Sequence, residues 1–219
     1  MSNLLNLLNV NTTFFTILGY QMSYIEFFGT LANLACVWLV AKKHILNWPI
    51  GIIGVLLFGT LFYQLHLYAD LSEQVYYLIT GFWGWYVWAK RKTKAEDDQN
   101  IIVTKNTDHE NQAWIITAIL GTIVYAWAMS NIHIWLPSLF PEPASFVLLD
   151  VFTTVLSFIA QYLLIIKRLE NWPIWIVVDV IGVGLYAKKG VPFVALLYLI
   201  FLFLAIKGYI TWRKTYEKQ

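Results

Sequence analysis

The sequence predicts an all-α, polytopic membrane protein with seven transmembrane helices, built as two parallel three-helix repeats joined by a linker helix. Three observations support this fold class. Of 219 residues, 59% are hydrophobic and 13% are charged, whereas soluble domains carry about 25% charged residues. Apolar runs of bilayer-spanning length recur along the chain. Finally, a shift of 124 residues, from Asn47 to Asn171, aligns the two halves of the sequence.

The N-terminal segment, residues 1–20, is rich in Leu but interrupted by Asn at a spacing near three. We expect an amphipathic helix that lies at the membrane interface, with an additional span as the alternative. Seven apolar segments of about bilayer length follow, of which the sixth is short. They cover approximately 24–41, 50–68, 71–89, 113–131, 145–166, 173–187 and 191–212.

Positive charge predicts the orientation of these segments. Of the 15 Lys and Arg residues, all but Lys188 and Lys189 fall at segment ends on one side of the membrane. Cytoplasmic loops carry the excess of Lys and Arg, so we expect this side to be cytoplasmic. The N-terminus is then outside and the C-terminus inside. The polar stretch 90–112 becomes a cytoplasmic linker between the halves.

The two halves share motifs as well as segment ends. Asn47-Trp48-Pro49-Ile50 recurs as Asn171-Trp172-Pro173-Ile174, and the same shift maps Gly84 to Gly208 and Trp88 to Trp212. Three helices would leave the second repeat inverted, so the helix near 113–131 restores the orientation and makes the repeats parallel. We expect an interfacial segment 1–20, a first repeat 21–92, a linker with its helix 93–142, and a second repeat with the C-terminal tail 143–219.

One carboxylate is difficult to explain by topology or capping. Asp179 falls two turns into an apolar helix, where a charged side chain costs about 2.5–3.5 kcal/mol. Trp172, Trp175 and Tyr186 lie on the same side of that helix, within an arc of roughly 80°. A structural partner on a neighbouring helix is one explanation. The functional interpretation is that Asp179 faces an aqueous cavity and recognises a polar or cationic molecule.

Other polar and aromatic residues are weaker candidates for the same site. Gln161 forms a polar stripe with Ser157 on the fifth segment, and Gln74 forms one with Tyr77 on the third. Hydrogen bonding between helices is the alternative for each stripe. Asn171 and Trp48, from the duplicated motif, complete the candidate set, although Asn47 and Asn171 also suit helix capping. Interfacial anchoring is expected for Trp83, Trp85, Trp88 and Trp212.

The sequence argues against several other classes of protein. A single Cys excludes an intrachain disulfide, and the four His residues lack metal-ligand spacing. There is no phosphate-binding Gly-rich loop and no Gly-x-Ser-x-Gly or His-Glu-x-x-His motif. We therefore expect neither a cofactor nor a catalytic site. A small molecule and the lipid bilayer are the expected partners, without nucleic acid.

The duplicated Asn-Trp-Pro-Ile, the Trp172-x-x-Trp175 pair and the 3+1+3 plan make the chain similar to the PnuC family of bacterial vitamin transporters, over roughly residues 20–214. Asp179 departs from the family pattern Trp-x-x-Trp-x-x-x-Asn, which ends in Asn. By that pattern the resemblance implies that Trp172 and Trp175 bind substrate, with Asp179 in the place of Asn. Gln161, Asn171, Gln74, Tyr77 and Tyr186 are added from helical geometry.

The resemblance also implies a function and a cellular setting. The implied activity is facilitated diffusion of nicotinamide riboside across the bacterial inner membrane by alternating access. A homotrimer, a fold related to the SWEET proteins and a cytoplasmic kinase that traps the product are implied as well. Thiamine or riboflavin is the alternative substrate. A membrane enzyme or a structural subunit is the remote alternative.

Overall fold

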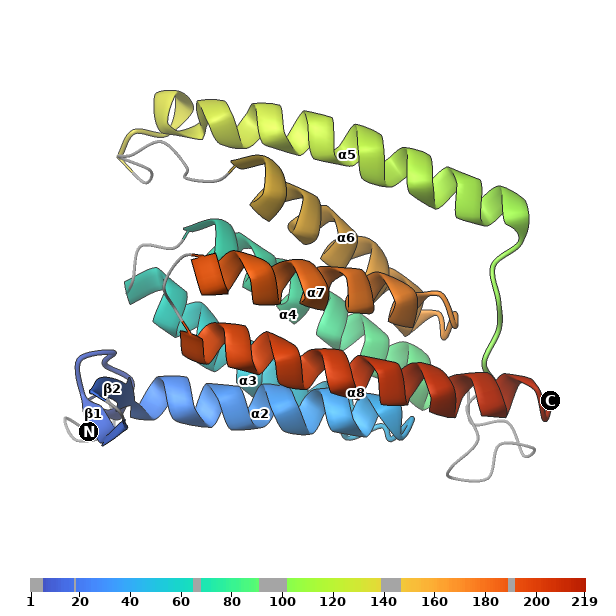
Figure 1. Cartoon of the computed structure of the whole chain (residues 1–219), viewed down its shortest axis with the longest axis horizontal. Helices are drawn as coiled ribbons and strands as arrows, with labels where there is room; N and C mark the ends of the chain where they lie inside the picture. Colours follow the sequence, from blue (N-terminus) through green and yellow to red (C-terminus); the bar gives the residue numbers. More distant parts are fainter. Residues whose placement is uncertain (1–5, 18, 65–67, 91–101, 139–146, 189–191) are drawn as a thin grey trace. The chain divides into compact units, whose positions relative to one another are not determined.

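A computed structural model describes residues 6–17, 19–64, 68–90, 102–138, 147–188 and 192–219 (Figure 1). All seven predicted helices are present, so the all-α fold class is confirmed, with one small β-hairpin added. The helices are α2 (Tyr24–Ala41), α3 (Asn47–Gln64), α4 (Tyr68–Lys90), α5 (Asp108–Trp135), α6 (Val147–Ile165), α7 (Asn171–Lys188) and α8 (Pro192–Tyr216).

The chain divides into two compact units, Met1–Ile101 and Ile102–Gln219. In the first unit α3 packs against α2 and α4. In the second unit α7 packs in the same way against α6 and α8, and α5 packs on α6. A shift of 124 residues places the bounds of α3 on those of α7, and the bounds of α2 and α4 within two residues of those of α6 and α8. The duplication is therefore present in the helices as well as in the sequence.

The surfaces of the helices are those of a membrane protein. Within the described residues, five helices are long and apolar enough to cross a bilayer, namely α2, α3, α5, α6 and α8. Along α5, the side chains of Ile115, Ile119 and Ile123 are all more than half exposed. Exposed apolar stripes of this kind are rare on soluble monomers. α4 does not reach the same hydropathy because it carries Asp70 and Glu73.

The amphipathic helix expected over 1–20 is wrong for the end of that segment. β1 (Thr13–Ile17) and β2 (Tyr20–Ser23) form an antiparallel hairpin. Thr, Phe and Ile dominate β1, and such β-branched and aromatic side chains favour strands. Gly19 adopts a φ of 84° between the strands, a conformation that only glycine adopts without strain. Residues 1–5 and 18 lie outside the described part of the chain.

Two side chains attach this N-terminal segment to the first unit. The Gln64 amide at the end of α3 accepts from the Val10 N–H at 2.9 Å and donates to the Leu8 carbonyl at 2.7 Å. The Tyr20 hydroxyl donates to Glu26 Oε1 at 2.6 Å. Burial, followed by this bond to the carboxylate, raises the pKa of Tyr20 above its ordinary value. The segment is therefore held to α2 and α3 at defined points.

The same turn ends the first helix of each repeat. Lys43 and Lys167 have left-handed backbones, with φ values of 59° and 62°. The Lys43 N–H donates to the Val40 carbonyl at 2.8 Å, and the Lys167 N–H donates to the Leu164 carbonyl at 3.0 Å. The following N–H groups reach one residue further back, which completes a Schellman motif at each helix end. These turns deliver the chain to the two Asn-Trp-Pro-Ile motifs.

Candidate functional site

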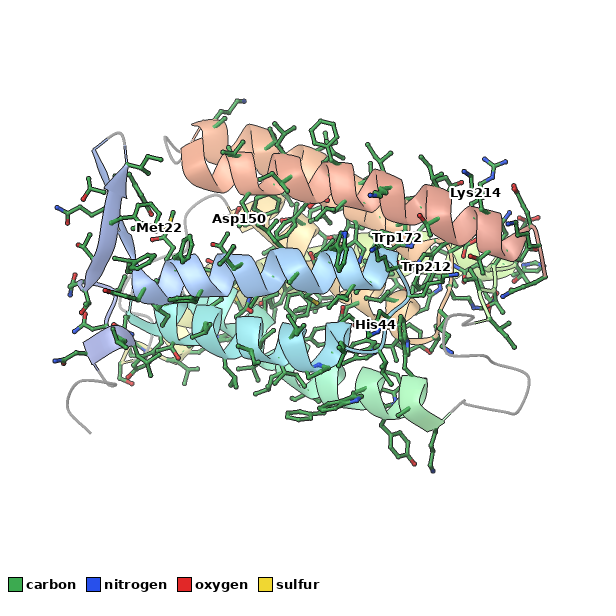
Figure 2. All side chains as sticks on the ribbon, turned by 90° about the horizontal axis from the view of Figure 1, so that it is seen from below. Met22, His44, Asp150, Trp172, Trp212 and Lys214 are labelled. Carbon is green, nitrogen blue, oxygen red and sulfur yellow. The ribbon has the colours of Figure 1, made fainter. Side chains whose placement is uncertain are left out.

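The tryptophans of the duplicated motif are wedges between helices. The Trp172 ring meets the Trp212 ring edge to face, with centroids 5.6 Å apart, and Figure 2 shows the two side by side. In the first unit the Trp48 and Trp88 centroids are 5.4 Å apart. Both Trp48 and Trp172 are buried. Each motif tryptophan therefore joins the second and third helices of its own repeat.

The expectation that Trp88 and Trp212 anchor the protein at the membrane interface is wrong. Their exposed fractions are 4% and 0%. A Cβ built at Gly84 or at Gly208 would lie within 2.3 Å of the facing motif tryptophan. These glycines therefore leave the space in which each tryptophan pair packs. Trp83 and Trp85, by contrast, are exposed.

The motif asparagines hold the preceding turns. Asn47 Nδ2 donates to the His44 carbonyl at 2.7 Å, and Asn171 Nδ2 donates to the Arg168 carbonyl at 2.5 Å. The amides thus act as donors to the turn and do not accept helix N–H groups as an N-cap would. Within the described residues, Asn171 Oδ1, Trp172 Nε1 and Trp48 Nε1 are buried without a hydrogen-bond partner. A buried acceptor and a buried donor are therefore available side by side at the start of α7.

Asp179 lies two turns beyond Asn171, in the middle of α7. Its exposed fraction is only 4%. No hydrogen bond or ion pair joins it to any residue in the described part of the chain. The preceding residue, Val178, belongs to an apolar cluster with Leu156 and Ile159 of α6, and the half-buried Trp175 packs against that cluster. The structure thus brings Trp175 and Asp179 together in an apolar setting on one helix.

A close approach of α8 borders this region and was not in the predicted set. A Cβ at Gly182 would lie 2.3 Å from Tyr198 Cδ1, so the Tyr198 ring rests directly on the α7 backbone. Gly182 is one turn beyond Asp179 on the same side of α7. A sequence signal for Tyr198 did exist, because it is the repeat equivalent of the candidate Gln74.

Two other candidates of the second unit are only partly placed. Gln161 is half-buried on α6, four residues after the buried Ser157, and it makes no hydrogen bond within the described residues. Tyr186 belongs to α7, but its side chain lies outside the described residues. Both remain predictions as substrate contacts.

The remaining candidates belong to the first unit. The Tyr77 hydroxyl donates to Glu73 Oε1 at 2.6 Å, one turn back on α4. Gln74 lines an open, mainly apolar groove of about 310 Å³ between α3 and α4. The same groove is lined by Val55, the repeat equivalent of Asp179. The first unit therefore has an apolar side chain at the position where the second unit has its carboxylate.

The linker segment before α5 is attached to the turn that precedes α7. The Thr104 N–H donates to the Lys167 carbonyl at 3.1 Å, and the Leu169 N–H donates to the Thr104 carbonyl at 2.9 Å. The Asn106 N–H donates to Glu170 Oε2 at 3.1 Å, and Arg168 forms an ion pair with Glu110 at 2.8 Å. These contacts fix the start of α7, and with it the positions of Trp175 and Asp179.

Comparison with known proteins gives a consistent relationship. Residues 23–214 match the sequence model of the Nicotinamide mononucleotide transporter family. The nicotinamide riboside transporter PnuC of Escherichia coli K12 is 32% identical, over 89% of this chain and 87% of that protein. PnuC of Neisseria mucosa is 28% identical, over 90% and 74%. The riboflavin/roseoflavin transporter RibM of Streptomyces davaonensis is 27% identical, over 93% and 91%.

A solved structure shows the same fold. The crystal structure of the vitamin B3 transporter PnuC superimposes with a TM-score of 0.72 and 25% identity, covering 89% of this chain and 83% of that one. The remote alternatives, a membrane enzyme or a structural subunit, do not fit these relatives, which are transporters. The chain is therefore a multi-pass membrane transporter that belongs to the nicotinamide mononucleotide transporter family.

Proposed function

We propose that this protein mediates the uptake of nicotinamide riboside without nucleotide hydrolysis, by alternating between outward-open and inward-open states. Its membership of the family over residues 23–214 carries this proposal, since relatives along nearly the whole chain are named for that substrate. A motif on α7 supports it, because the Trp-x-x-Trp-x-x-x-Asp sequence places Trp175 and Asp179 on one side of the helix.

The chemistry of the substrate fits this side of α7. Nicotinamide riboside carries a flat pyridinium cation, and the face of an indole such as Trp175 attracts a cation by about 0.5–2 kcal/mol. The Asp179 carboxylate supplies the opposite charge. Gln161 can hydrogen-bond the carboxamide or the ribose hydroxyls. A site with few hydrogen bonds binds weakly enough to release its substrate, which a facilitator requires.

Trp172 and Asn171 remain in the proposed site for a different reason. Their unpaired Nε1 and Oδ1 atoms are a donor and an acceptor that a ligand or an ordered water can satisfy, and buried polar groups seldom stay unpaired. Trp48, Gln74 and Tyr77 are proposed as the contribution of the first repeat. Tyr186 is proposed to extend the aromatic lining along α7.

The proposed setting is the bacterial inner membrane, with the N-terminus outside and the C-terminus in the cytoplasm. The excess of Lys and Arg at one set of helix ends supports this orientation. The two repeats would rock against each other, as in transporters built from internal repeats. A homotrimer and a separate cytoplasmic kinase that phosphorylates the imported product follow from the family resemblance. Crosslinking in native membranes tests the trimer.

Counterflow in proteoliposomes tests the substrate. Vesicles loaded with unlabelled nicotinamide riboside should take up the labelled compound, whereas protein-free vesicles should not. Unlabelled thiamine or riboflavin inside the vesicles should not drive this uptake. Absence of exchange with nicotinamide riboside, together with exchange of thiamine or riboflavin, would show that the substrate assignment is wrong.

Riboflavin is the second candidate because one relative is named a riboflavin/roseoflavin transporter. Its ring system is neutral, so the Asp179 carboxylate would have no opposite charge to bind. A neutral substrate leaves that buried group unexplained. The charge on α7 therefore favours nicotinamide riboside, and the same counterflow assay separates the two.

A further inference from the structure

Asp179 differs from the other carboxylates whose contacts are known in this protein. Tyr20 donates to Glu26, Tyr77 donates to Glu73, and Arg168 pairs with Glu110. Asp179 is more deeply buried, at 4% exposure, and makes no hydrogen bond or ion pair within the described residues. A carboxylate in this situation has lost its water without gaining a partner, which strongly disfavours the ionised form.

The helices around Asp179 offer no compensating cation. The chain is helical on both sides of it, because α6 and α8 pack against α7. Apart from the basic last turn of α8, the titratable side chains described on these three helices are Asp150, Tyr162, Lys188, Tyr198, Lys207 and Tyr209. Of these, Tyr198 rests on Gly182, one turn from Asp179, and it is neutral at physiological pH.

The fold itself does not require an acid at this position. Val55 occupies the equivalent place in the first repeat, on α3, whose bounds match those of α7 under the repeat shift. That helix packs between its two neighbours in the same way as α7. Asp179 is therefore an addition to the scaffold, and its charge has to be neutralised by something that comes and goes.

We propose that Asp179 carries either a proton or the substrate cation, so that the protein exchanges one nicotinamide riboside cation for one proton. This inference rests on the proposed function. In the empty, inward-facing protein the carboxylate binds a proton from cytoplasmic water. As a neutral acid it then crosses to the outward-facing state at little electrostatic cost.

The second half of the cycle runs in the opposite direction. When the substrate cation enters from outside, the Asp179 proton leaves to the external water and the carboxylate pairs with the pyridinium. The loaded protein returns inward with these two opposite charges, and the substrate is released as a new proton binds. One cation enters and one proton leaves in each cycle, so no net charge crosses the membrane.

Two consequences separate this cycle from simple diffusion of a cation. Net uptake needs the empty protein to return, so it depends on the proton gradient and not on the membrane potential. Exchange of substrate for substrate never uses the empty protein, and it should be indifferent to both gradients. Riboside exchange therefore serves as an internal control that tests the proposed function alone.

The experiment uses the full-length protein in sealed proteoliposomes with labelled nicotinamide riboside. With the interior one pH unit more acidic, net uptake should reach about tenfold accumulation, since a 1:1 exchange follows the tenfold proton ratio. A potassium diffusion potential of about 59 mV, negative inside, should leave accumulation unchanged. The same potential would give about tenfold accumulation if the cation moved alone.

Asp179→Asn provides the matched variant, because it keeps the shape of the side chain and removes the ionisable group. It should retain riboside exchange with weaker binding, lose the response to the pH gradient, and accumulate substrate according to the potential. Asp150→Asn, at the first turn of α6, should behave as the unmodified protein. A pyranine signal inside the vesicles should rise with substrate entry only where Asp179 is present.

Accumulation by the unmodified protein that follows the potential and ignores the pH gradient would overturn the antiport while leaving the function intact. An Asp179→Asn variant with an unchanged pH response would overturn it as well. Failure of riboside exchange under every condition would instead refute the proposed function.

Discussion

The Trp172 ring occupies the space that a side chain at Gly208 would need. A Cβ at Gly208 would lie 2.3 Å from Trp172 Cη2, and the repeat equivalents Gly84 and Trp48 show the same relationship at 2.1 Å. Real Cβ atoms do not approach other atoms so closely. The joint between the second and third helices of each repeat therefore depends on one glycine and one tryptophan.

A methyl group at this joint should destabilise the fold. We expect Gly208→Ala to cost about 1–3 kcal/mol, the usual range for overpacking a well-filled core. Gly184→Ala is the control, because its Cβ would meet nothing within 4 Å. Removing that helix glycine should be neutral or should stabilise the protein by about 0.5–1 kcal/mol. Thermal unfolding in detergent compares the two, and equal melting temperatures would refute the wedge.

The half-buried Trp175 should contribute to binding through the face of its ring. Trp175→Ala should weaken nicotinamide riboside binding by about 2–30-fold, which corresponds to the 0.5–2 kcal/mol of a cation–π contact. Trp175→Phe keeps an aromatic face and should retain part of the affinity. Isothermal titration of the purified protein measures both variants. An alanine variant with full affinity would remove Trp175 from the site.

The attachment of the N-terminal hairpin should depend on alkaline pH. Because the pKa of Tyr20 is raised in the folded protein, its contribution to stability is complete below its ordinary pKa of 10.0 and is lost as pH rises towards the higher folded value. Limited proteolysis between residues 6 and 23 should therefore accelerate only above about pH 10. Tyr20→Phe should abolish this pH dependence, and a dependence that survives the substitution would assign it to another group.

The start of α5 allows a capping contribution to be separated from an ion pair. Thr107 Oγ1 accepts from the Glu110 N–H at 3.2 Å, and the Glu110 side chain accepts from the Thr107 N–H at 2.7 Å. Thr107→Ala should cost about 1 kcal/mol through loss of the cap. Glu110→Gln keeps the capping box but loses the ion pair to Arg168, and should cost less than about 1 kcal/mol because that pair is partly exposed.

Chemical denaturation in detergent, followed by circular dichroism, measures both changes at the start of α5. A larger effect of Glu110→Gln than of Thr107→Ala would show that the ion pair to Arg168, and not the cap, holds the linker against the turn before α7.

Much of this protein was determined by sequence alone. Hydrophobic runs fixed the seven helices, since a bilayer sets the length of a spanning segment. The offset from Asn47 to Asn171 predicted the duplication to within two residues at the bounds of the matched helices. A lone acid among Ile and Val identified Asp179, because charge in an apolar helix requires a reason.

The tertiary structure decided what those residues contact. Trp88 and Trp212 are expected at the membrane interface from composition, but glycines on their own helices and tryptophans far away in the sequence bury them. The hairpin over 13–23 replaces a predicted helix because strand pairing and the bonds to Gln64 override a weak polar periodicity. Whether a buried carboxylate has a partner depends on side chains that meet only after folding, so no pattern in the sequence could show that Asp179 has none within the described residues.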